Sequence, residues 1–118
     1  MDSTFKELKT AIRKGSVKNV VAYGETKNPP ALPYVLLQPE PKVPDCQAFQ
    51  VWVFMAMGKN AELEDYVKHE LPELIYSVKN ILGQPKYKSN GTYDGVGADV
   101  TKGSLVAGKL FYLPLIIR

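Results

Sequence analysis

The residues of this chain that could carry chemistry are few and widely spaced. His69 could act as a general acid or base, and Cys46 as a nucleophile if its surroundings stabilised the thiolate. Asp94 and Asp99 lie in a glycine-rich stretch. No nucleophile falls at a spacing that would bring it to His69, and no cysteine or histidine cluster has metal-ligand spacing. We therefore expect no enzyme and no cofactor or metal site.

The glycine-rich stretch 94–99 has a superficial likeness to a nucleotide-binding loop. It lacks the GxGxxG pattern, a following Gly-Lys-Ser/Thr and a following helix. Phosphate binding is therefore the weaker interpretation, and a plain loop is favoured.

Length and composition indicate one ordinary globular domain, residues 1–118. The chain is 45% hydrophobic and 23% charged, with a formal net charge of +3, which is typical of a soluble protein. The N-terminus lacks the apolar block of a secretory signal, and Cys46, the one cysteine, cannot form an intrachain disulfide. These features predict synthesis in the cytoplasm and a reducing compartment.

The stretch 49–57 predicts a central strand covered on both faces. All but one of its side chains are apolar, and Gly58 closes it. Shorter strands are predicted over 18–23 and 34–38, and the pattern 105–117 predicts a last strand that Pro114 limits at its end. Because no helix separates the first three strands, we expect an antiparallel meander.

Two helices are predicted from apolar residues at helical spacing. The first covers about 2–14 and stops at Gly15, and the second covers about 61–82 and stops at Gly83. Pro72 should kink the second helix or split it into two. His69 and Tyr76 fall on the side of this helix away from its apolar stripe, so both should face solvent or a partner.

Proline-rich loops separate the strands, over 24–33 and 39–46, and Asn90-Gly91 predicts a small hairpin before the last strand. The fold class is therefore α+β: a mostly antiparallel sheet of about four strands, a long helix on one face and a short N-terminal helix, in the order α-β-β-β-α-β. Prolines lower the cost of ordering a contact surface. The candidate interface residues are Pro29, Pro30, Leu32, Pro33, Tyr76, Tyr93, Lys102, Leu115 and Ile117.

This order of elements resembles the tail-terminator, tail-completion and neck proteins of long-tailed bacteriophages. The residues that carry the resemblance are Phe5-Lys-Glu-Leu8 with Ile12, Val21-Ala-Tyr-Gly24, Pro33-Tyr-Val-Leu-Leu37, 49–57 and Gly108-Lys-Leu-Phe-Tyr112. The resemblance implies a homo-oligomeric ring, possibly a hexamer, that ends growth of the tail tube and joins the tail to the neck. Its partners would be further copies of itself, the tail-tube protein and the neck or connector proteins.

The same resemblance implies a location in the virion, after assembly from the host cytoplasm. Nucleic acid would meet such a ring only by passing through its lumen. Pro72 and the glycine-rich stretch 94–103 have no counterpart in the family pattern, so another head-tail connector or a minor capsid or tail protein remains an alternative.

Two classes of function compete with virion assembly. A small nucleic-acid-binding module would require Tyr23, Tyr34 or Trp52 to face solvent for base stacking. The two-faced apolar strand predicts instead that Trp52 is buried. An enzyme built on His69 and the residues named with it above is the weakest interpretation.

Overall fold

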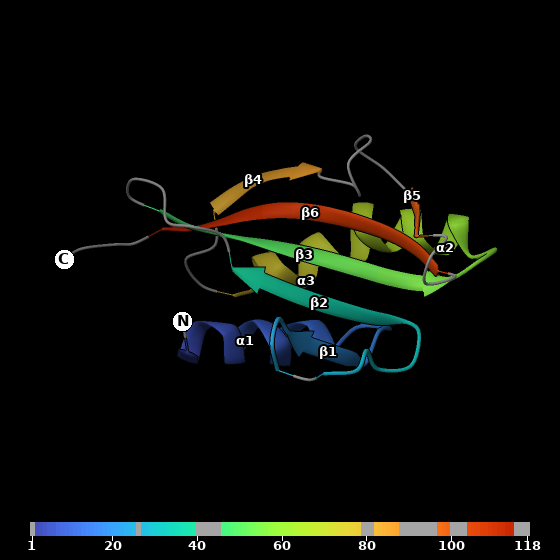
Figure 1. Ribbon diagram of the computed structural model, residues 1–118. Coiled ribbons are helices and arrows are strands. Elements are labelled where there is room, and N and C mark those ends of the chain that lie inside the picture. Colours follow the sequence, from blue (N-terminus) through green and yellow to red (C-terminus); the bar gives the residue numbers. More distant parts are fainter. Residues whose placement is uncertain are drawn as a thin grey trace.

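The computed structural model describes the backbone of residues 2–25, 27–39, 46–78, 82–87, 97–99 and 104–114, and side chains within 6–25, 27–39, 49–78, 104–108 and at 111. The fold is α+β, with a mixed sheet and a helical layer (Figure 1). In chain order the elements are α1 (Asp2–Arg13), β1 (Asn19–Ala22), β2 (Tyr34–Pro39), β3 (Cys46–Ala56), α2 (Asn60–Asp65), the π-helical turn η1 (Tyr66–Glu70), α3 (Leu71–Tyr76), β4 (Leu82–Tyr87), β5 (Gly97–Asp99) and β6 (Ser104–Pro114).

Strand β3 is central, as its apolar sequence predicts. The sheet order is β1-β2-β3-β6-β4, and β5 also pairs with β6. β3 and β6 pair antiparallel along their full lengths, from Cys46 opposite Pro114 to Ala56 opposite Ser104. The four predicted strands are β1, β2, β3 and β6, and β4 and β5 are additional strands on β6. The hairpin turn expected at residues 90–91 lies outside the described residues.

The predicted meander is wrong for the first pair of strands. β1 pairs with β2 in parallel, with Asn19 opposite Tyr34 and Ala22 opposite Leu37. Loop 23–33 runs back past β1 before the chain enters β2 at the end where β1 began (Figure 1). A tight turn would have forced an antiparallel pair, whereas a loop of this length allows a parallel one.

The described helical segments lie on one face of the sheet, where they bury one continuous cluster. Its fully buried members include Leu8 and Ile12 from α1, Val35, Phe49, Val53 and Phe111 from the sheet, and Leu63, Leu71 and Ile75 from the second helical segment. Leu8 and Ile12 are among the apolar residues at helical spacing that predict the first helix, and both are fully buried. The hydrophobic effect of burying these side chains is the main force that fixes the helices on the sheet.

The opposite face of the sheet carries a smaller cluster. Tyr34, Phe54 and Val106 are buried there, and Leu36 and Trp52 pack against them partly buried. The rings of Tyr34 and Phe54 stack with centroids 4.6 Å apart. Apolar residues thus line both faces of β3 as predicted, but Trp52 is only half-buried, since no described helix covers this face.

The second helix changes to a π-helical turn just ahead of Pro72 and stays helical across it, so Pro72 perturbs the helix as predicted but does not split it. Proline has no amide hydrogen and its ring crowds the preceding turn, and the chain responds with a wide turn in which the Leu71 amide donates to the Tyr66 carbonyl, five residues back. The predicted end at residue 82 is wrong: α3 stops at Tyr76, and Leu82 and Gly83 belong to β4.

Candidate assembly surface

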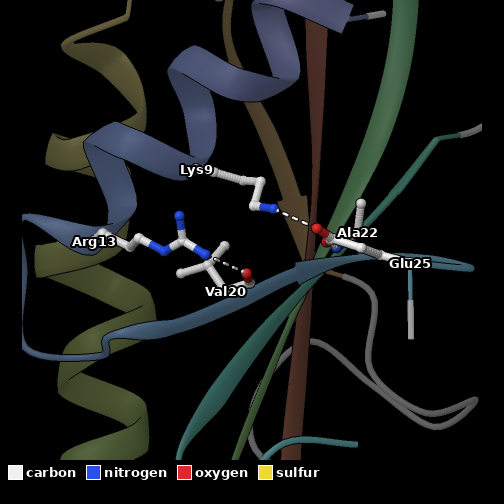
Figure 2. Close-up of polar contacts among 5 residues, drawn as sticks. All are labelled: Lys9, Arg13, Val20, Ala22 and Glu25. Carbon is white, nitrogen blue, oxygen red and sulfur yellow. Dashed lines mark hydrogen bonds and ion pairs between the residues drawn. The ribbon is translucent and has the colours of Figure 1, made fainter. Parts of the chain in front are cut away.

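Loop 23–33 holds most of the described residues that the sequence nominates as an interface, and its first part is fixed by Glu25. One oxygen of this carboxylate accepts a hydrogen bond from the Ala22 amide at 2.7 Å, and the other forms an ion pair with Lys9 Nζ, also at 2.7 Å (Figure 2). The Glu25 amide in turn donates to the Ala22 carbonyl. Lys9 belongs to α1, so one side chain ties the loop to the helix.

These contacts change the acidity of the loop carboxylate. The hydrogen bond from Lys9, and after it the one from the Ala22 amide, lowers the pKa of Glu25 below its ordinary value of 4.5. Both donors favour the charged form. Glu25 is consequently ionised, and the anchor intact, throughout the neutral pH range.

Further hydrogen bonds hold the two ends of the loop. The Tyr23 amide donates to the Leu37 carbonyl at 2.8 Å, and the Asn19 side-chain amide donates to the Ala31 carbonyl at 3.0 Å. Gly24 adopts φ +84°, a conformation that favours glycine. Arg13 Nη2 also donates to the Val20 carbonyl at 3.2 Å, which joins α1 to β1 (Figure 2).

Pro29 and Pro30 lie beside a hollow between the loop and the face of the sheet away from the helices. The hollow has a volume of about 380 Å³ and is lined by Val21, Ala22, Tyr23, Gly24, Asn28, Pro29, Pro30, Tyr34 and Leu36. We call it the Tyr23 hollow after Tyr23, which lines it and is 68% exposed. Its wall is mostly apolar and aromatic, which suits contact with another protein.

Leu32 and Pro33 lie beside a second hollow, at the end of the sheet where β3 stops. It has a volume of about 440 Å³ and is lined by Ser16, Val17, Leu32, Pro33, Met55, Ala56, Lys59 and Glu62. We call it the Leu32 hollow; the Leu32 side chain is 39% exposed. Pro29 and Pro30 thus line one hollow, and Pro33 lines the other.

Tyr76 lines neither of the two hollows. It is 41% exposed on α3, and its ring meets Phe111 of β6 edge to face, with centroids 6.1 Å apart. Burial raises the pKa of its hydroxyl. His69 is exposed as predicted. Tyr93, Lys102, Leu115 and Ile117 lie outside the described residues.

Sequence reasoning missed several residues of this surface. Lys9 and Glu25 are far apart in sequence, and no periodicity relates them. Lys59 and Glu62 read as ordinary charges at the start of a helix, although they also edge the Leu32 hollow. Tyr23 offered a weak signal, since it is an aromatic residue between a strand and a proline-rich loop.

Within the described part of the chain, no group of three or more His, Cys, Asp and Glu side chains could hold a metal ion. None of the described helices is long and apolar enough to span a membrane. No protein-family model matches the chain, and no curated protein sequence is significantly similar to it.

Proposed function

We propose that this chain is a structural virion protein that forms an oligomeric ring at the head-proximal end of a phage tail, where it ends tube growth and joins the tail to the neck. Neither catalysis nor a cofactor takes part in this proposal. The observation that carries it is the fixed loop 23–33, which is exposed and apolar at two hollows yet held by side-chain hydrogen bonds at both ends.

A fixed loop suits a protein whose ligand is another protein. Binding costs free energy for each segment that must become ordered, and a loop already ordered in the free chain avoids part of that cost. The prolines restrict the unfolded and unbound conformations further. Another head-tail connector or minor tail protein would use the same surface, and the position along the tail distinguishes these roles.

Reconstitution with tail tubes tests the proposal. The purified chain would be added to tubes assembling from the tube protein encoded in the same genome, with bovine albumin as the control. We expect negative-stain images of rings on one end of each tube and a bounded tube length. Tubes that continue to grow, with both ends bare, would exclude the terminator role.

The exposure of Tyr23 favours a nucleic-acid-binding module, because this tyrosine is 68% exposed and its ring could stack on a base. A stacking platform needs several exposed rings, but Tyr34 is buried and Trp52 half-buried. Fluorescence anisotropy with a labelled single-stranded oligonucleotide would distinguish a nucleic-acid-binding module from the proposed ring protein. Salt-sensitive binding that Tyr23→Ala abolishes would favour this module over the ring.

A further inference from the structure

The lining of the Leu32 hollow is suited to binding an apolar segment of polypeptide. Leu32, Pro33 and Ala56 contribute exposed apolar surface to its lining, and Val17 and Met55, which also line it, are almost wholly buried. Its volume of about 440 Å³ falls within the roughly 300–1,000 Å³ that ligand sites occupy. A few aliphatic side chains from another segment would remove this surface from water.

The margin of the same hollow is charged. Lys59 Nζ and Glu62 Oε2 lie 3.6 Å apart, and both side chains are more than half exposed. An exposed pair of this geometry contributes little to stability, so Glu62 can exchange its partner at small cost. The Leu32 hollow therefore offers an apolar floor beside an available carboxylate.

The chain itself contains a segment with the matching pattern. The described strand β6 ends at Pro114, and the sequence continues as Leu115-Ile-Ile-Arg118. Three aliphatic residues followed by an arginine complement an apolar floor with a carboxylate at its edge. Arginine is well suited to this role, because its guanidinium can bind a carboxylate through two parallel hydrogen bonds.

The segment 115–118 cannot reach the hollow of its own chain. Pro114 pairs with Cys46 at one end of β3, and the hollow lies beside Met55 and Ala56 at the other end. At about 3.3 Å per residue the two ends of this strand are roughly 30 Å apart. Four extended residues span at most about 14 Å. This segment could therefore fill the hollow only from a second copy of the chain.

We propose that residues 115–118 of one subunit bind in the Leu32 hollow of the next, with the aliphatic side chains on its floor and Arg118 paired with Glu62. The contact is head to tail, since it joins two different surfaces of the same chain, and repetition of such a contact closes a ring when the rotation permits. The inference rests on the proposed ring and specifies what holds neighbouring subunits together.

A charge exchange tests the contact in the full-length chain. Glu62→Arg and Arg118→Glu would each be made alone and then combined, and the solution mass measured by light scattering. We expect each single variant to fall from the ring to the 13.1 kDa chain and the double variant to recover the ring. Glu73→Arg is the matched control: Glu73 is exposed on α3, outside the hollow, and its reversal should leave the mass unchanged.

A mixing experiment then tests the head-to-tail geometry. Glu62→Arg retains a working segment and Ile117→Asp retains a working hollow, so the two variants together should form a dimer that cannot grow. Circular dichroism on each variant establishes that the fold is kept. Single variants that keep the ring, a double variant that fails to recover it, or a mixture that stays monomeric would each overturn the inference.

The two proposals fail in different ways. If light scattering shows that the wild-type chain stays monomeric at every protein concentration tested, the head-to-tail contact is overturned. The terminator role is tested separately, by whether the chain caps tail tubes. Rings that cap tubes but ignore the charge reversals leave the proposed function standing without this interface.

Discussion

At the scale of single residues, the feature that stands apart is the hydroxyl of Tyr66. Its side chain is 2% exposed within the core, and the hydroxyl has no hydrogen-bond partner among the described residues. Burial, and after it the negative charge of Glu70, raises the pKa of this phenol. A buried polar group without a partner costs free energy that the folded state must offset elsewhere.

Tyr66→Phe is therefore expected to stabilise the chain by about 1 kcal/mol, because it removes the orphaned hydroxyl and keeps the ring. Chemical denaturation would measure the free energy of unfolding, with Tyr76→Phe as the exposed control, expected to change it by less than ~0.5 kcal/mol. A loss of stability at Tyr66 would mean that the hydroxyl has a partner, such as an ordered water.

The Glu25 anchor predicts a dependence on pH. Its pKa is lowered in the folded state, so its contribution is complete above the unfolded value of 4.5 and is lost as the pH falls through the folded pKa. Glu25→Gln should lower the melting temperature at pH 7, and the difference from wild type should shrink below pH 4.5. A difference that stays constant down to acidic pH would mean that the charge of Glu25 contributes nothing.

At the scale of elements, the close contact between the end of α1 and the second helical segment depends on Gly15. Glu70 accepts hydrogen bonds from the Ser16 amide and from Ser16 Oγ, the latter at 2.9 Å. A Cβ at Gly15 would collide with this carboxylate and with the Leu74 side chain. Gly15 does not share the positive φ of Gly24 and Gly58. The lack of space for a side chain, rather than the backbone conformation, therefore explains why a glycine stands at this position.

Gly15→Ala should destabilise the chain by no more than about 1 kcal/mol, because the Glu70 and Leu74 side chains must leave their preferred rotamers while alanine restricts the unfolded chain. A thermal melt would measure the change, with Lys14→Ala on the exposed neighbour as control. In a Leu74→Ala background part of the clash is removed, so the cost of Gly15→Ala should be smaller there. Equal costs in both backgrounds would show that the clash with Leu74 is not responsible.

The wide turn at η1 also decides which leucine is in the core. On a regular α-helix each step of four residues advances the apolar stripe by about 40°, and a turn with more residues reduces this drift. Leu63, Val67, Leu71 and Ile75 are consequently all buried, while Leu74 is only partly buried.

Leu71→Ala should cost about 2–5 kcal/mol of unfolding free energy, and Leu74→Ala distinctly less. Urea denaturation of both variants measures the contrast. Val53→Ala on the facing strand serves as a second core truncation, with a smaller loss because valine is smaller. Equal losses for the two leucines would contradict the placement of the stripe.

At the scale of the whole molecule, the core and the proposed assembly surface lie in different parts of the chain. The core lies between the helices and one face of the sheet, whereas Pro29 and Pro30 lie at the surface beside the Tyr23 hollow. A substitution of the whole loop would also remove the Glu25 anchor and the hydrogen bond to the Ala31 carbonyl. The proline pair is therefore the cleaner place to perturb the loop.

Changing Pro29 and Pro30 together to serine should lower the unfolding free energy by only about 1–2 kcal/mol, through greater freedom of the unfolded chain. We expect ring formation to weaken more than stability does, because the loop must be ordered on binding. Light scattering over a concentration series and a thermal melt on the same sample provide both measurements. A ring that assembles at unchanged concentration would exclude the proline pair from the interface.

The sequence by itself determined the local elements: the apolar stretch 49–57 as central strand, the inner stripe of the first helix and the irregular helical turn ahead of Pro72. These depend on side-chain periodicity and on the backbone of residues within a few positions of one another. Only the tertiary structure decided that β1 and β2 are parallel, that the described helical segments share one face, and that Lys9 meets Glu25. Such contacts join residues far apart in the chain, and their energies depend on how the elements pack, which no local spacing encodes.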